Sequence, residues 1–361
     1  MNEGQEYVWM GSIPLQIHLH ESEVTTLPPP PPALVLAPRM GYLPLLISLL
    51  KPHFCTTLPP GVDTIWFEYK GLPLKWYIPT GVLFDLLCME PERPWNLTVH
   101  FRGYPSNLLL PCDGEDSVKW SFINSLKEAA YVINGNCKNV MNMSQTDQVE
   151  LWGSVLNGNL ESYRRVSSKL KLETIEDFVP KKETIEDEHT ENIDSVSNKS
   201  EQSTGDAEAA GQVKTSRIPV RLYLWTVNND FDDFEDAPNI DNWDKVSYIN
   251  RPVEIYKEDD KYFSLNDAVK RLLPEYFPES SFVNEEDANI NQSTEEGENS
   301  SDPASSSHPL EIAEIKCVRI QGISDLPLEI PFSWVVHNLM NPEYFLHMCV
   351  CLKVSEANPV Q

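Results

Sequence analysis

Two long acidic segments divide the sequence and limit what it can fold into. Residues 173–211 carry twelve Asp and Glu residues against three Lys, and residues 279–314 carry ten against none. Both are almost free of aromatic residues, so they cannot bury enough apolar surface to offset the entropy lost on ordering. We therefore expect a disordered linker at 173–216 and a disordered insertion at 279–311, with the folded domains in the remaining sequence.

The acidic segments also account for most of the formal net charge of -27. They contribute -9 and -10, which leaves -8 for the rest, an ordinary value for a chain of this size. A basic stripe that could bind phosphates is absent, so nucleic acid is not expected as a partner. The seven cysteines lack CxxC spacing, the first residues do not form a signal peptide, and the apolar run 43–50 is too short to cross a membrane. These features predict a cytoplasmic protein with reduced thiols.

Residues 1–104 predict a compact α+β domain. Alternating apolar residues from Ile13 to Leu19 are typical of a half-buried strand, and Lys70-Gly71 is a typical hairpin turn. Thr80 is the expected cap of one helix. Strands are expected at 13–19, 34–36, 64–69, 74–78 and 95–101, and helices at 42–54 and 80–87. A mixed sheet with helices on one face fits this order best. Ubiquitin-like β-grasp domains have this layout, although order alone does not fix the topology.

Residues 112–172 predict a helix-rich domain. The first helix, after Asp113 or Asp116 as cap, ends at Gly135. Its buried stripe consists of Val118, Phe122, Leu126, Ala129 and Ile133. A second helical run begins near Ser144 and is split at 157–159. Its apolar members are Val149, Trp152, Val155, Leu156, Tyr163, Val166 and Leu170.

Residues 217–354 predict a second α+β domain, interrupted by the acidic insertion. Strands are expected at 217–227, 248–256, 315–320 and 344–354, and helices at 264–273 and 331–338. Ser264 is the expected cap of the first of these helices, and Pro274 its stop. The chain is therefore expected to hold two similar α+β domains around a helical one.

Lys127 lies off the apolar stripe of the first helix in the middle domain. It shares a face with Trp120 and Tyr131, and no acidic residue stands three or four positions from it. A lysine in such a setting is either an ordinary solvated residue or a site to which something is attached.

Motifs of enzymatic chemistry are absent from the sequence. There is no phosphate-binding glycine loop, GxSxG elbow or HExxH helix, and His18 and His20 lack further metal ligands nearby. We therefore expect no cofactor, no metal and no catalytic residue. Two rival hypotheses remain open: a cytosolic Cys-dependent peptidase or ligase, and an adaptor that reads proline-rich or ubiquitin-like ligands.

Several motifs closely resemble the autophagy protein 5 family, in its plant-type form with long insertions. The matching segments are Trp66-Phe-Glu-Tyr, Pro73-Leu-Lys-Trp-Tyr-Ile-Pro, Gly81-Val-Leu-Phe-Asp-Leu-Leu, Pro94-Trp-Asn-Leu-Thr-Val-His-Phe, Ser125-Leu-Lys-Glu-Ala, Arg217-Ile-Pro-Val-Arg-Leu-Tyr, Gln321-Gly-Ile, Pro331-Phe-Ser-Trp and Tyr344-Phe-Leu-His. The resemblance implies two ubiquitin-like domains that flank a helix-rich domain.

The resemblance also implies a role as a non-catalytic conjugation scaffold. Lys127 would accept the C-terminal glycine of autophagy protein 12 in an isopeptide bond, delivered by autophagy protein 10. Trp120 and Tyr131 would pack against the attached partner, or serve as partial core. Arg39 would contact the helix of autophagy protein 16 between the ubiquitin-like domains, or only pair locally.

By the same resemblance, the conjugate would act as an E3-like factor. It would promote transfer of autophagy protein 8 from autophagy protein 3 to phosphatidylethanolamine. It would reach the isolation membrane, at the phagophore assembly site, through its partners.

Overall fold

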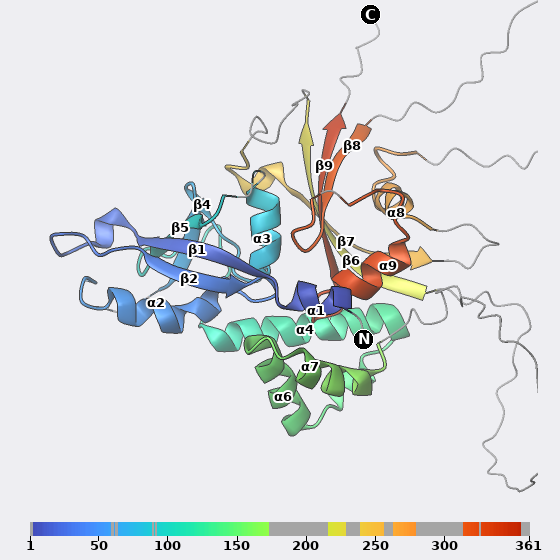
Figure 1. Cartoon of the computed structure of the whole chain (residues 1–361), viewed down its shortest axis with the longest axis horizontal. Coiled ribbons are helices and arrows are strands. Elements are labelled where there is room, and N and C mark those ends of the chain that lie inside the picture. The colour runs from blue at the N-terminus through green and yellow to red at the C-terminus, as the bar shows by residue number, and fades with distance from the viewer. Residues whose placement is uncertain are drawn as a thin grey trace, which may run out of the picture.

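The structure, a computed structural model, describes residues 3–58, 61, 64–88, 90, 92–172, 216–228, 239–255, 263–278, 313–324 and 326–354. These residues form two sheet-containing domains and a helical domain that contacts both (Figure 1). The disordered segments expected at 173–216 and 279–311 lie outside the described residues, apart from Ser216. None of the helices described is long and apolar enough to span a membrane.

The N-terminal domain contains a five-stranded mixed sheet in the order β2-β1-β5-β3-β4. Its central strands β1 and β5 run parallel, and β2 pairs antiparallel with β1. Ile13, Leu15 and Ile17 are almost fully buried, which confirms the alternation expected for β1. The elements are α1 (Glu3–Trp9), β1 (Ser12–Leu19), β2 (Ala33–Pro38), α2 (Ile47–Phe54), β3 (Trp66–Tyr69), β4 (Leu72–Pro73), α3 (Thr80–Leu87) and β5 (Trp95–His100).

The helical domain is built around one long helix, α4. The elements are α4 (Glu115–Asn134), α5 (Lys138–Met141), α6 (Gln145–Leu156) and α7 (Leu160–Ser167). The core between them contains Phe122, Leu126 and Trp152, and it extends to Trp9 and Tyr42 of the N-terminal domain. The expected apolar members of the second run are buried or half-buried except Val149, which is 58% exposed. Val149 lies within α6 as expected, on the side of the helix that faces solvent.

The C-terminal domain repeats the same central arrangement in a four-stranded sheet, ordered β7-β6-β9-β8. Its middle strands β6 and β9 run parallel, as β1 and β5 do. Ser264 caps α8 in a reciprocal capping box with Asp267, as the sequence predicted for this serine. The elements are β6 (Ser216–Val227), β7 (Ser247–Ile255), α8 (Leu265–Leu272), β8 (Ala313–Arg319), α9 (Phe332–Leu339) and β9 (Leu346–Val354).

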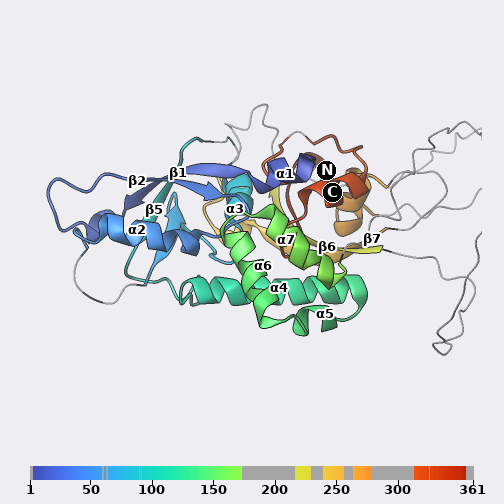
Figure 2. The same ribbon diagram turned by 60° about the horizontal axis from the view of Figure 1, so that its bottom comes forward.

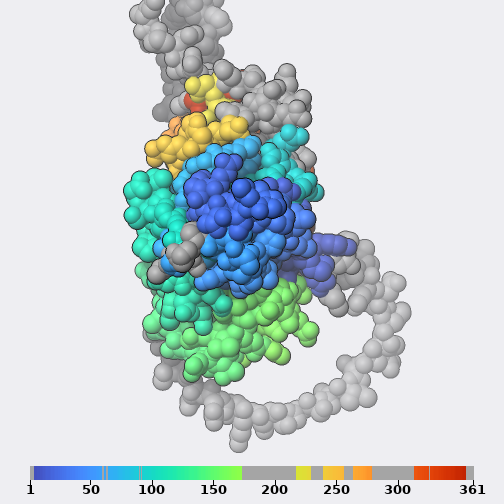
Figure 3. Space-filling view, turned by 90° about the vertical axis from the view of Figure 1, so that its left-hand side faces the viewer, coloured from blue at the N-terminus to red at the C-terminus, as the bar shows by residue number. Residues whose placement is uncertain are grey.

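The two faces of the C-terminal sheet have different roles. One face packs on α8 and α9 to form that domain's own core. The opposite face supplies Tyr223, Trp225, Cys317, Cys349 and Cys351 to the core of the N-terminal domain. Figures 2 and 3 show the result: the N-terminal domain (blue) lies against both the helical domain (green) and the C-terminal domain (yellow to red). The α+β fold with two β-grasp domains and a helical domain is therefore confirmed.

Some local predictions were wrong. The second hairpin strand is the short β4 and not residues 74–78, because Leu74 is the last residue there to donate a backbone hydrogen bond across to Phe67. Thr80 lies inside α3, which begins after Pro79 without a side-chain cap. α4 begins after Gly114, whose φ is +85°, and neither Asp113 nor Asp116 caps it.

Candidate attachment site and the junction of the three domains

Lys127 lies near the middle of α4. Glu115 and Asp116 in the first turn favour this helix because they face the positive end of its dipole. Gly135 ends it as expected: it adopts φ +69° and its N–H donates to the carbonyl oxygen of Tyr131. The apolar stripe, with Val118 and Leu126 fully buried, turns the face that carries Lys127 away from the core.

The amine of Lys127 has no hydrogen bond or ion pair with any described residue. Its side chain is half-buried along the helix, while the neighbouring Glu128 is engaged elsewhere. Glu128 Oε2 accepts from Arg221 Nη2 at 3.0 Å, and Glu128 Oε1 accepts from Asn250 Nδ2 at 2.7 Å. The carboxylate nearest in sequence therefore ties α4 to the C-terminal sheet and does not hold the lysine. The amine can therefore move without breaking a hydrogen bond or ion pair to any described residue.

Trp120 and Tyr131 lie on the same side of α4 as Lys127 by helical spacing. They are 59% and 62% exposed, and neither belongs to a hydrophobic core of the described residues. Their exposure rules out the alternative role as partial core. Packing against an attached partner stays a prediction for both.

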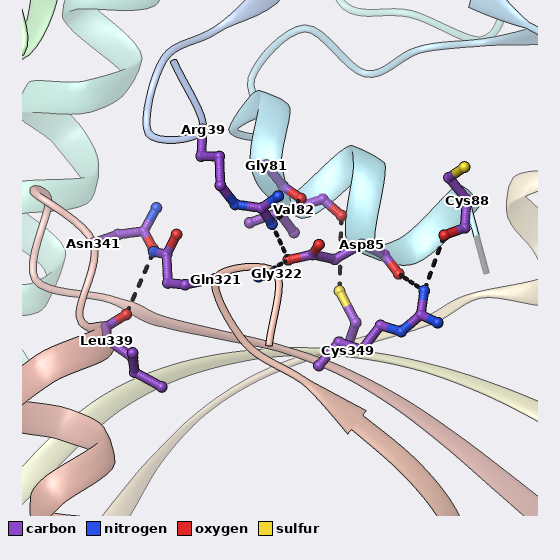
Figure 4. A network of polar contacts seen from close by, with 11 residues as sticks. Arg39, Gly81, Val82, Asp85, Cys88, Gln321, Gly322, Leu339, Asn341 and Cys349 are labelled. Carbon is purple, nitrogen blue, oxygen red and sulfur yellow. Dashed lines mark hydrogen bonds and ion pairs between the residues drawn. The ribbon is translucent and has the colours of Figure 1, made fainter. Parts of the chain in front are cut away.

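A buried polar network joins the two β-grasp domains (Figure 4). Arg39, which follows β2, forms an ion pair with Asp85 of α3, and the side chains are 9% and 6% exposed. Asp85 Oδ2 also accepts the Gly322 N–H of the C-terminal domain at 2.8 Å. Arg319 of β8 donates to the carbonyl oxygen of Cys88 at 2.9 Å. Burial raises the pKa of Asp85 and the Arg39 charge acts against that rise, but the donors around Oδ2 are those that an ionised carboxylate needs.

Arg39 forms a local ion pair with Asp85, which is one of the two roles that the sequence left open for it. A partner contact by Arg39 stays a prediction. Sequence reasoning missed Asp85, Arg319 and Gly322, since no local pattern links Arg39 to Asp85, 46 positions away, or Asp85 and Cys88 to residues more than 200 positions away.

Exposed apolar side chains occur beside this network and on the neighbouring contact between α1 and α9. Met10 is 68% exposed and precedes Gly11, which abuts the Arg39 side chain. Ile323, 36% exposed, follows Gly322 on the other domain. α1 packs on α9 where Gly4 meets Asn338; α1 also carries the exposed Tyr7, and α9 the exposed Trp334. The sequence could not separate these residues from core, because an apolar residue on a short helix or in a turn has the same pattern in both roles. We call Tyr7, Met10, Ile323 and Trp334 the interdomain apolar set.

Nothing in the described part of the chain groups three or more His, Cys, Asp or Glu residues in a way that could hold a metal ion. Burial raises the pKa of the thiols of Cys88, Cys112 and Cys349, which is the opposite of what a cysteine nucleophile needs. These thiols do not support the rival hypothesis of a cysteine-dependent enzyme.

Three family models match the chain. They describe the UblA domain of autophagy protein ATG5 at residues 8–101, its alpha-helical bundle region at 115–173 and its UblB domain at 217–350. The three matched ranges correspond to the N-terminal, helical and C-terminal domains of this structure.

Relatives are similar along nearly the whole chain. Autophagy protein 5 of Arabidopsis thaliana is 60% identical over 354 residues, covering 98% of this chain and 99% of the relative. That of Oryza sativa subsp. indica is 49% identical over 377 residues, covering 99% and 96%. The crystal structure of Kluyveromyces marxianus Atg5 superposes with a TM-score of 0.59 at 20% identity, covering 97% of this chain and all of that one, so it supports the fold. With family models over most of its length and relatives this similar, the chain belongs to the autophagy protein 5 family and is an autophagy protein with ubiquitin-like domains.

Proposed function

We propose that this protein is the acceptor of autophagy protein 12 and that Lys127 is the point of attachment. The observation that carries the proposal is the Lys127 amine, which has no hydrogen bond or ion pair within the described residues and lies beside exposed Trp120 and Tyr131. The membership of the autophagy protein 5 family supports it.

The chemistry is an acyl transfer. The glycine carboxyl group of autophagy protein 12 arrives as a thioester on the cysteine of autophagy protein 10. The deprotonated amine of Lys127 attacks the thioester carbonyl carbon, the C–N bond forms, the C–S bond breaks and the cysteine thiolate leaves. The lysine proton passes to a base of the E2-like enzyme or to water. This chain supplies a positioned amine on a rigid helix and does not itself activate the thioester.

The interdomain apolar set supports binding of autophagy protein 16. Met10 and Ile323 adjoin glycines that lie against Arg39, and Tyr7 and Trp334 lie on the contacting helices α1 and α9; an amphipathic helix could bury its apolar side on such residues. Arg39, Asp85 and Gly322 would hold the two domains at the spacing that this helix requires.

The conjugate would then promote transfer of autophagy protein 8 from autophagy protein 3 to phosphatidylethanolamine, as a non-catalytic E3-like factor. It would be cytoplasmic and peripheral on the phagophore membrane, to which its partners recruit it.

Replacing Lys127 by Arg tests the attachment. Arginine keeps the positive charge and helix propensity but cannot form this isopeptide bond. We expect the higher-mass species containing autophagy protein 12 to disappear from an immunoblot of cells that express Lys127→Arg. The matched control is Lys119→Arg on the same helix, which should conjugate like the wild type. A conjugate of unchanged amount on Lys127→Arg would show that another residue is the acceptor.

A further inference from the structure

A cavity of about 200 Å³ lies where the three domains meet. The loop after β4 supplies Lys75 and Tyr77, α4 supplies Ser121 and Ser125, and the C-terminal domain supplies the remaining polar groups and rings. The full lining is Lys75, Tyr77, Ile78, Ser121, Ser125, Arg221, Tyr223, Trp243, Val246 and Tyr248. Because no single domain builds it, the cavity exists only when all three are docked. We call it the junction cavity.

The charge of the lining favours an anion. Two of the ten residues, Lys75 and Arg221, are cationic and none is acidic. Two carboxylates outside the lining act on Arg221: Glu128, which pairs with it and is shared with Asn250, and Glu343. Burial lowers the pKa of Lys75 by more than the charge of Asp244, which lies outside the lining, raises it. A lysine whose charged form is penalised by burial gains when an anion enters.

Several hydrogen-bond donors around the cavity are unused. The buried Nε of Arg221 has no acceptor among the described residues. Lys75 Nζ has no hydrogen bond there; it stacks 4.4 Å from the centre of the Trp243 ring. The hydroxyls of Tyr77, Tyr248, Ser121 and Ser125 likewise bond to nothing in the described part of the chain. Burial raises the pKa of Tyr77 and Tyr248, which keeps both phenols protonated as donors.

The walls of the cavity are fixed before any ligand arrives. Trp243 Nε1 donates to the carbonyl oxygen of Pro73 at 2.8 Å, which fastens the C-terminal wall to the N-terminal domain. The Arg221 guanidinium lies 3.8 Å from the Phe345 ring centre. The Tyr223 hydroxyl bonds to His347 at 3.2 Å. A preformed pocket with aromatic walls and a few convergent polar groups is typical of small-molecule sites.

We propose that the junction cavity binds a small aromatic anion, of the aryl phosphate class, with the phosphate on Lys75 and Arg221 and the ring against Trp243, Tyr77 and Tyr248. These contacts come from the N-terminal and C-terminal domains, and Ser121 and Ser125 of the helical domain lie in the same lining. A bound ligand therefore stabilises the docked arrangement of the domains, by an amount that grows with the logarithm of its concentration relative to its dissociation constant. The proposal does not depend on conjugation at Lys127, because binding of the ligand is measured on the unconjugated protein.

Isothermal titration calorimetry of the full chain with phenyl phosphate tests the proposal. We expect saturable binding with a Kd of about 1 mM or tighter. Inorganic phosphate and phenol, each carrying half of the ligand, should bind at least about tenfold more weakly, because each lacks one set of contacts. Equal binding of inorganic phosphate and phenyl phosphate would overturn the proposal, as would absence of saturable binding.

Two variants connect the binding to the cavity. Lys75→Gln removes one charge-assisted contact and should weaken phenyl phosphate about tenfold. Lys138→Gln, an exposed residue on α5 away from the cavity, should bind like the wild type. Tyr77→Phe keeps the ring and removes one donor, so it should weaken binding by less than Lys75→Gln does. Unchanged affinity of Lys75→Gln, with a circular dichroism spectrum like that of the wild type, would refute the assignment.

Discussion

The buried pair of Arg39 and Asp85 gives the sharpest test of how the two β-grasp domains hold together. In Asp85→Ala the Arg39 guanidinium, 9% exposed, keeps its charge but loses its partner. Removing one member of a buried ion pair costs about 3–5 kcal/mol, because the remaining charge stays desolvated. The Gly322 N–H loses its acceptor as well, at a smaller cost, because Gly322 is exposed and water can replace the carboxylate. Since the two losses share one carboxylate, we expect a total of at least about 3 kcal/mol.

The double variant Arg39→Met/Asp85→Ala separates the charge from the other effects. It removes the unpaired charge and leaves only the orphaned N–H and lost packing, so it should be more stable than Asp85→Ala by about 2 kcal/mol. Urea unfolding followed by tryptophan fluorescence measures both, with Trp225 buried at the domain contact as one reporter. Hydrogen exchange at the Gly322 amide should accelerate in both variants.

The control is Asp241→Ala, whose pair with Lys245 is exposed and whose loss should leave the unfolding midpoint close to that of the wild type. The reasoning fails if Asp85→Ala is as stable as this control. It also fails if the double variant is no more stable than the single one, because the cost would then not come from a buried unpaired charge.

Three further predictions follow from other features of the structure. Gly322→Ala should destabilise the domain contact, because an added Cβ would lie 2.7 Å from Arg39 Cζ at a backbone φ of +81°; urea unfolding should show a lower midpoint, and an unchanged midpoint would contradict the geometry. Burial lowers the pKa of His347, so the unfolded chain binds the proton more readily and the free energy of unfolding should fall as the pH drops below about 6.5. His347→Gln should lose less of this free energy between about pH 7 and 5 in urea unfolding. An equal slope for the variant and the wild type would refute this cause. Trp334→Ala and Met10→Asp should weaken pull-down of the autophagy protein 16 helix while conjugation continues; normal pull-down would exclude the interdomain apolar set as its site.

The sequence predicted those parts of the fold that depend on short-range periodicity. The alternation of Ile13, Leu15 and Ile17 gave a strand, and the spacing of Val118, Phe122 and Leu126 gave the long helix that ends at Gly135. These patterns persist in the structure because each element buries one face. The same spacing placed Lys127 off the apolar stripe, on one face of the helix with Trp120 and Tyr131.

Features that depend on contacts between domains could not be predicted. Arg39 reads as an ordinary charged residue after a strand, and only the folded chain brings Asp85 and Gly322 to it. Glu128 reads as a solvated neighbour of Lys127, yet it binds Arg221 almost a hundred residues away. Val149 is an apolar residue of α6 that faces solvent, and the sequence pattern alone does not separate such a residue from its buried neighbours.

The C-terminal sheet contributes to the cores of two domains, and this affects how the chain folds during synthesis and whether a fragment of it is stable. The N-terminal core is finished by Tyr223 of β6 and by Cys349 and Cys351 of β9, the last strand described. During synthesis, the first domain therefore has an apolar surface left uncovered until more than 200 further residues have been translated. An isolated N-terminal fragment would keep that surface exposed and tend to aggregate. The N-terminal domain is thus synthesised well before its core can be completed, because completion of the core needs strands from the far end of the chain.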